Sequence, residues 1–109
     1  MATTKFELWL EKVNQELEEK WNNQFEHTYW TNLYYTKGRK FIKIIGNGRV
    51  WGFVSMVDGT HKGEPIKEGD LLMAATWTQP AKHSRGNIFD GTDQWGMYGP
   101  VGLSAMKKN

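Results

Sequence analysis

The segment 80–86, with the sequence PAKHSRG, brings three nitrogen-bearing side chains close together: Lys82, His83 and Arg85. Two cations about three residues apart in a loop can clamp one phosphate, because arginine offers a planar fork of donors and lysine a point charge. In the structural interpretation, Arg85 instead satisfies backbone carbonyls of its own loop or pairs with Asp90. We expect this segment to form a loop carried by a rigid scaffold, which is where binding residues concentrate.

A second group of cations lies earlier in the chain, where residues 37–57 contain five Lys or Arg and no Asp or Glu. Four of these cations are assigned to a nucleic-acid-binding surface: Arg39, Lys40, Lys43 and Arg49. Aromatic rings among such cations can stack the bases of a single strand. Trp95 and Tyr98 are the aromatic candidates for stacking or for a protein interface, since glycines surround them. Trp51 and Trp77 fall on predicted strands, so we expect them to pack in the core.

The sequence shows no complete catalytic or metal-binding set. It has no cysteine, which excludes a disulfide scaffold, a zinc ribbon and a cysteine nucleophile. His27, His61 and His83 match no compact metal motif. A pair of Asp58 with His61, or of His83 with Asp90, would act as acid and base only if the fold brought the two side chains together. We therefore expect no cofactor, no metal and no catalytic role.

Length and charge bound the class of protein. The 109 residues suit a single domain over 1–109 that needs no disulfide to build a core. Residues 1–36 carry three Lys and six Glu, which gives −3, whereas the five cations of residues 37–57 give +5. Such blocks can face partners of opposite sign or can be solvated faces. No apolar run approaches the ~18 residues of a membrane span and the N-terminus lacks a signal-peptide pattern, so we expect a cytoplasmic protein without a membrane partner.

Hydrophobic periodicity predicts one helix followed by strands. The helix, over about 4–22, is predicted from apolar residues at spacings of three and four: Phe6, Leu10, Val13 and Leu17. We expect these side chains to dock the helix onto a sheet. Strands are predicted over 33–36, 39–45, 49–57 and 71–77, with a polar loop over 58–68 and a short closing strand near 100–103.

The dipeptide Asn47-Gly48 predicts a two-residue hairpin turn. With that turn, Ile45 opposes Val50. On the other face Ile44 opposes Trp51 and Ile42 opposes Phe53. We therefore expect these last four residues to line one buried face: Ile42, Ile44, Trp51 and Phe53.

The elements together predict an α+β fold that is mainly β. An N-terminal amphipathic helix packs on a small, strongly bent antiparallel sheet over about 29–104, and residues 105–109 form a frayed tail. An SH3-like barrel is the first expectation, because glycines suit the bends of a small barrel. An open meander with the helix on one face is the second.

The order of several short motifs resembles a group of small proteins from tailed bacteriophages and marine metagenome sequences. The motifs are TKGRKFIKI, VWGFV, GDLLMAATW, PAKHSRGNIFD and YGPVGL, and the resemblance covers roughly 33–103. Met73 and Gln79 replace lysines of the usual pattern and so remove positive charge near the PAKHSRG segment. The family has no assigned activity. The resemblance therefore implies a phage or phage-like origin and supplies no catalytic residue.

These observations predict a small, non-catalytic binding protein in the cytoplasm of a host cell. A nucleic acid is the first expected partner. A host or phage protein, contacted through Trp95, Tyr98 and the acidic helix, is the second. An enzyme and a minor virion component are further alternatives, and the sequence does not indicate an oligomeric state.

Overall fold

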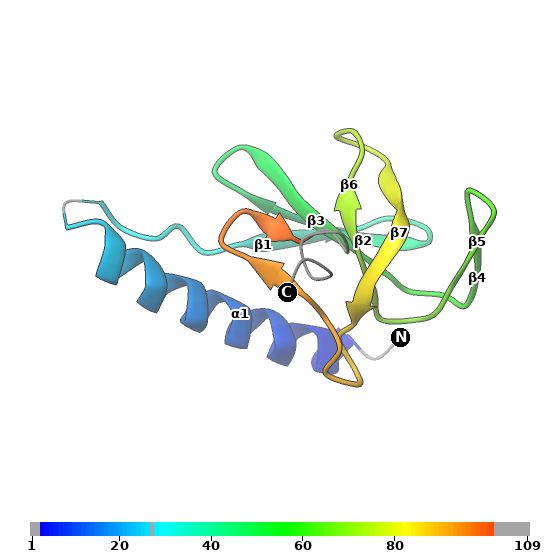
Figure 1. Cartoon of the computed structure of the whole chain (residues 1–109), viewed down its shortest axis with the longest axis horizontal. Helices are drawn as coiled ribbons and strands as arrows, with labels where there is room; N and C mark the ends of the chain where they lie inside the picture. Colours follow the sequence, from blue (N-terminus) through cyan, green and yellow to red (C-terminus); the bar gives the residue numbers. More distant parts are fainter. Residues whose placement is uncertain (1–2, 27, 102–109) are drawn as a thin grey trace, which may run out of the picture.

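One helix precedes nine strands in the part of the chain that the computed structural model describes, residues 3–26 and 28–101. The elements are α1 (Thr3–Gln24), β1 (Tyr34–Lys37), β2 (Phe41–Gly46), β3 (Arg49–Ser55), β4 (Gly59–His61), β5 (Glu64–Ile66), β6 (Asp70–Ala74), β7 (Pro80–Asn87), β8 (Trp95–Gly96) and β9 (Gly99–Pro100). An antiparallel sheet has the order β1-β2-β3-β6-β7, and β4–β5 and β8–β9 form separate hairpins (Figure 1). The predicted α+β, mainly β class is confirmed.

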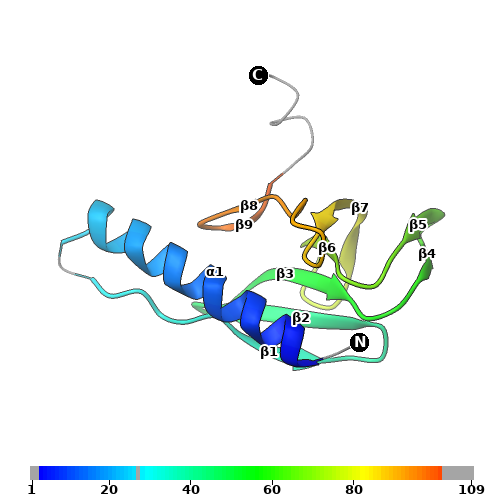
Figure 2. The same cartoon turned by 90° about the horizontal axis from the view of Figure 1, so that it is seen from below.

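The helix α1 runs along one face of the sheet, and β8–β9 lies over the same core (Figures 1 and 2). The apolar stripe of α1 is fully or almost fully buried and consists of Phe6, Leu10, Val13 and Leu17. These side chains share one core with strand residues, including Ile42, Ile44 and Leu71. Burying each such side chain contributes about 1.5–3 kcal/mol. The predicted docking of the helix is therefore confirmed. Among the described residues, no helix is long and apolar enough to cross a bilayer.

The Asn47-Gly48 turn is present. Asn47 has φ 54° and Gly48 has φ 72°, and positive φ at both central residues is the hallmark of the hairpin turn whose twist matches the flanking strands. The predicted pairing of Ile45 with Val50 follows directly from this turn and is confirmed.

A β-bulge changes the register immediately beyond that pair. Ile44 opposes Gly52 instead of Trp51, so Trp51 is an extra residue on β3. Trp51 still points into the core with Ile44. Phe53, however, now pairs with Lys43 and contacts Phe41 on the opposite face, with ring centroids 6.3 Å apart. The prediction that Phe53 shares a face with Ile42 and Ile44 is wrong, because one inserted residue reverses the alternation.

The segment 80–86 is a strand and not the predicted loop. As part of β7 it pairs Ala74 with Pro80, Leu72 with Ser84 and Asp70 with Asn87. Between the first and the last of these pairs the chain advances by four residues on β6 but by seven on β7. The strand β7 therefore carries three extra residues, which form bulges. Proline is tolerated because it is the first residue of a strand at the sheet edge.

The strand β6 ends at Ala74, three residues before its predicted end. The Thr76 hydroxyl accepts hydrogen bonds from the amides of Thr78 and Gln79, at 3.2 and 3.0 Å. Such side-chain bonds offer the backbone a turn in place of a ladder. Trp77 therefore lies in the turn and is 53% exposed. The expectation of core packing is wrong for Trp77 and confirmed for Trp51, which is 6% exposed.

The sheet is strongly bent at the junction of β3 and β6. Only two residue pairs join these strands, Phe53 with Leu72 and Val54 with Leu71, and β6 then runs steeply across the direction of β3 (Figure 1). The strands β1 and β7 are the sheet edges, and no pairing joins them in the described chain. The closed barrel thus stays a prediction, as does the single domain over 1–109. Of the described residues in the closing strand predicted near 100–103, only Pro100 lies in a strand, β9, and β9 pairs with β8 and not with the main sheet. Residues 102–103 and the tail 105–109 lie outside the described residues.

Candidate functional site

A hollow of about 500 Å³ lies where the β1–β2 turn, the β4–β5 hairpin and the start of β7 meet. We call it the basic hollow, because its charged lining residues are Lys37, Arg39, Lys40 and Lys43. None of its described lining residues is Asp or Glu. Phe41 and Phe53 supply the apolar part of the lining. Cations and aromatic rings thus share one cavity.

The β1–β2 turn gives these cations a defined position. The amide of Gly38 donates to the carbonyl of Phe41 at 2.8 Å, which closes the turn that carries Arg39 and Lys40. The Lys40 carbonyl accepts from the Met56 amide, also at 2.8 Å. Both cationic side chains are exposed, so their charge faces water beside a fixed backbone.

His61 attaches the β4–β5 hairpin to this site. Its Nε2 lies 3.0 Å from the carbonyl oxygen of Pro80, and a carbonyl can only accept, so Nε2 carries the proton. The His61 ring also meets the edge of Phe41, with centroids 5.2 Å apart. Three segments distant in sequence are thereby held around one hollow.

Trp77 lies at the rim. The Nζ atom of Lys43 is 4.9 Å from the centroid of the Trp77 ring, which is within the range of a cation–π interaction. Lys43 also lines the hollow, and so do Thr78 and Gln79, which follow Trp77 in the turn. Sequence reasoning did not assign Trp77 to a site, because its exposure depends on the Thr76 turn. Lys37 and His61 were also missed, although Lys37 belongs to the same cationic block.

The three residues of the PAKHSRG segment have different environments on β7. Lys82 is exposed and lies two residues beyond Pro80, or roughly 7 Å along the strand. It therefore extends positive charge away from the hollow. His83 Nδ1 lies 3.3 Å from a carboxylate oxygen of Glu64. Arg85 is half-buried, and its buried Nε makes no hydrogen bond within the described chain.

Arg49 and Tyr98 both line a smaller cavity of about 80 Å³ at the other end of β2. We call it the aromatic cavity, because its lining includes Trp21, Trp30 and Trp51. Tyr98 is 69% exposed. Arg49 is therefore separated from Arg39 and Lys40 by the length of β2, whereas Lys43 lies midway along that strand.

Trp95 makes structural contacts. Its indole N–H donates to Asp93 at 2.6 Å, and the indole of Trp9 donates to the same carboxylate oxygen at 2.9 Å. Its ring also packs on Trp51, with centroids 6.1 Å apart. These contacts hold the segment before β8 against α1, and they support packing as the role of Trp95.

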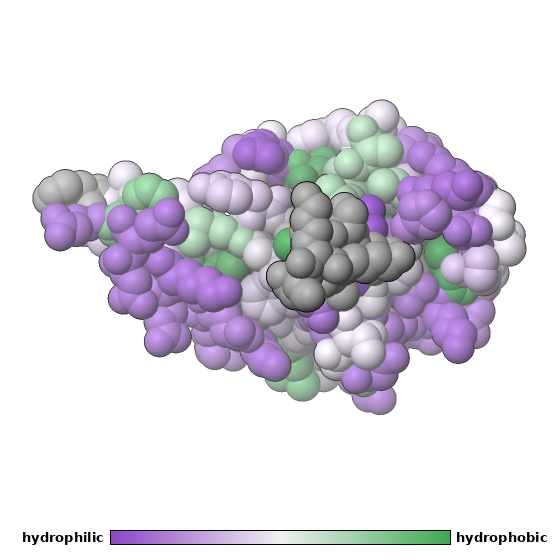
Figure 3. Space-filling model, in the orientation of Figure 1, coloured by the Kyte–Doolittle hydropathy of each residue, from purple (hydrophilic) through white to green (hydrophobic). Residues whose placement is uncertain are grey.

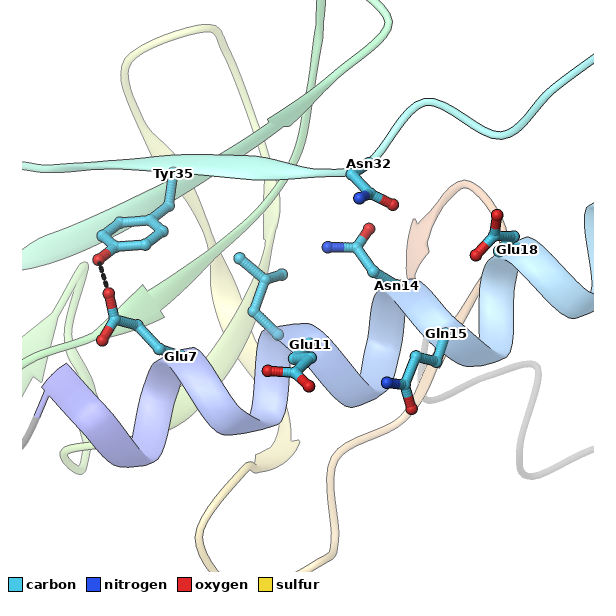
Figure 4. A pocket seen from close by; sticks show the side chains of 8 residues that line it. Glu7, Glu11, Asn14, Gln15, Glu18, Asn32 and Tyr35 are labelled. Carbon is cyan, nitrogen blue, oxygen red and sulfur yellow. Dashed lines mark hydrogen bonds between the residues drawn. The ribbon is translucent and has the colours of Figure 1, made fainter.

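An acidic groove of about 370 Å³ lies between α1 and the segment 32–35. Glu7, Glu11 and Glu18 line it (Figure 4). The Tyr35 hydroxyl donates to Glu7 at 2.7 Å, and this bond, together with desolvation and the Glu7 charge, raises the pKa of Tyr35. Hydrophilic residues cover much of α1 (Figure 3). Carboxylates thus line the groove on the α1 side of Tyr35, while Thr36 and Lys37, the next residues of β1, line the basic hollow.

In comparisons with known proteins, no family model matches the sequence, and no curated protein or solved structure matches it significantly.

Of the three histidines, His27 lies outside the described residues.

Proposed function

We propose that this chain is a non-catalytic nucleic-acid-binding module and that the basic hollow is its binding site. The observation that carries the proposal is the composition of the hollow, with four cations, aromatic residues and no described carboxylate. Phosphate contacts dominate the affinity of proteins for nucleic acids. Aromatic rings beside those contacts provide a second, uncharged source of affinity.

Size and charge distribution support this assignment. The volume of about 500 Å³ lies within the range of ligand sites in proteins. The acidic groove bears the opposite charge and borders α1 instead. A polyanion would therefore be attracted to the hollow and repelled from the groove.

The resemblance carried by PAKHSRGNIFD supports a phage-type origin and a site of action in the host cytoplasm. Lys82, on β7 beyond Pro80, would extend the positive track along the edge strand. His83 and Arg85 lie farther along the same strand and are proposed only as its continuation.

A second candidate function is the binding of a host or phage protein through the aromatic cavity. The exposed ring of Tyr98 and the half-buried rings of Trp21 and Trp30 favour it. Aromatic anchors of this kind are enriched in protein interfaces. This function would depend on Tyr98 and not on the β1–β2 turn.

Charge removal at matched positions tests the first proposal. Fluorescence anisotropy would measure the affinity of a labelled mixed-sequence oligonucleotide for the wild type and for the variants Arg39→Gln and Arg49→Gln. Each variant loses one exposed arginine, but only Arg39 lines the basic hollow. Losing one phosphate contact should weaken binding roughly fivefold to tenfold at moderate salt. Arg49→Gln should change the affinity by less than about twofold.

Two outcomes would contradict the proposal. One is the absence of binding to DNA and RNA at ~50 mM salt, where phosphate contacts are strongest. The other is an equal loss of affinity in both variants, which would indicate diffuse attraction. Binding to inorganic polyphosphate as tight as binding to the oligonucleotide would show a general polyanion site.

A further inference from the structure

We infer that the site takes a single strand, and that one unpaired base stacks on the indole of Trp77 at the rim of the basic hollow. This inference rests on the proposed function of the hollow. It assigns a binding role to Trp77, which the sequence analysis expected to pack in the core, and it names the form of nucleic acid that the site accepts.

The position of Trp77 is fixed by its turn and not by packing of its ring in the core. The amides of Ala75 and Thr76 donate to the Gln79 carbonyl at 2.9 and 3.1 Å. The Thr76 hydroxyl accepts two further amides from the same turn. The side chain of Trp77 is nevertheless 53% exposed. A large apolar ring is thus presented to solvent from an ordered backbone.

Lys43 couples this ring to the hollow. Its Nζ lies 4.9 Å from the Trp77 centroid, and the same side chain lines the basic hollow. Because the ammonium group lies over one face of the indole and the side chain is 53% exposed, we assign the opposite face as the stacking surface. A nucleotide whose base lies on that face would have its phosphate close to Lys43 and to the cations of the β1–β2 turn.

This geometry favours a single strand over a duplex. The faces of paired bases are covered by their neighbours in a duplex, so an indole on a surface turn cannot reach them without unstacking. In a single strand the faces are accessible, and every base offers one. Stacking on one aromatic side chain strengthens binding by roughly fivefold to hundredfold.

The experiment is a cycle that removes the indole from the protein and the bases from the ligand. The affinities of the wild type and Trp77→Ala would be measured for a single strand, for the same strand made abasic throughout, and for the matching duplex. The abasic strand keeps the phosphates and lacks the stacking partner. Tyr98→Ala is the matched control, since Tyr98 is more exposed than Trp77 and lies at the other end of β2.

We expect Trp77→Ala to weaken binding to the intact single strand by roughly fivefold to hundredfold. The same variant should bind the abasic strand and the duplex within about twofold of the wild type. Trp77→Phe should keep part of the affinity because it keeps a ring. Tyr98→Ala should match the wild type with all three ligands.

An equal loss on intact and abasic strands would overturn the inference, because the effect would not involve a base. Equal wild-type affinity for the intact and the abasic strand would also overturn it, even if Trp77→Ala failed to fold. In both cases binding itself survives, so the proposed function would stand. Absence of binding to every ligand would overturn the proposed function and this inference together.

Discussion

Asn14 joins α1 to the segment that leads into β1. Its Oδ1 accepts from the Leu33 amide at 2.7 Å and from the Trp30 indole at 3.2 Å. Its Nδ2 donates to the Leu33 carbonyl at 3.2 Å. Leu33 is 5% exposed, so its two backbone groups depend on this amide in place of a strand partner. Asn14→Ala removes all three bonds at once.

The loss of stability in Asn14→Ala follows from the polar groups that would be left without hydrogen-bond partners. The amide and the carbonyl of Leu33 would each lose a part-buried hydrogen bond, and an unsatisfied buried group costs about 1–3 kcal/mol. The indole of Trp30 is half-exposed and can bond to water. Allowing for partial relaxation, we expect Asn14→Ala to lower the free energy of unfolding by about 2–4 kcal/mol.

Urea denaturation followed by circular dichroism would measure this loss as a shift of the midpoint at constant slope. Gln15→Ala is the matched control, since it truncates an exposed amide on the next residue of α1. It should change stability by less than about 0.5 kcal/mol. A free energy of unfolding for Asn14→Ala within that same margin of the wild type would refute the reasoning.

Three further predictions concern stability. Gly86→Ala should cost at least about 2 kcal/mol, because φ is +96° and the new Cβ would come within van der Waals overlap of the Thr92 carbonyl oxygen. Gly91→Ala, with φ +78° and open space around it, should cost only about 1 kcal/mol in the same denaturation assay. Leu17→Ala should cost about 2–5 kcal/mol, because Leu17 is fully buried, and an unchanged melting temperature would contradict this. The Thr92 hydroxyl and amide donate to Asp90 and hold the pKa of Asp90 below its ordinary value of 3.8. The stability that ionised Asp90 contributes through these bonds is therefore present above about pH 4 and is lost as the pH falls through the pKa of Asp90 in the folded state. The difference in the free energy of unfolding between the wild type and Asp90→Asn should accordingly shrink as the pH is lowered.

Local patterns in the sequence predicted the elements that are determined by neighbouring residues, such as a helix whose apolar side chains recur at a regular spacing. The helix α1 was predicted within two residues because four apolar residues repeat at helical spacing on one face. The Asn47-Gly48 turn was predicted because both residues tolerate positive φ. In both cases the information lies within a few neighbouring residues.

The bulges could not be predicted from the same patterns. Trp51 is an extra residue on β3, and the apolar residues on both sides of it hide the change of face. In β7 three extra residues and a proline remove any alternation, so the segment reads as a loop. Its strand character comes from pairing with β6, which is a tertiary effect.

The candidate site was predicted in part. The cations of the β1–β2 turn are close in sequence, and their clustering on one surface was therefore expected. The contributions of His61 and Trp77 depend on how the β4–β5 hairpin and the bent β6–β7 pair fold back toward β2. Arg49 lines the aromatic cavity and not the basic hollow, a separation that proximity in the sequence does not reveal.

The most direct test of nucleic-acid binding at the basic hollow is the salt dependence of the affinity for a single strand. The slope of log K against log salt is about −0.7 for each phosphate contacted. The double variant Arg39→Gln/Lys40→Gln should therefore reduce the magnitude of the slope by about 1.4. Arg49→Gln should leave the slope of the wild type unchanged. A slope that is the same in the wild type and the double variant would contradict the account, because the charges of the hollow would then not contact phosphates.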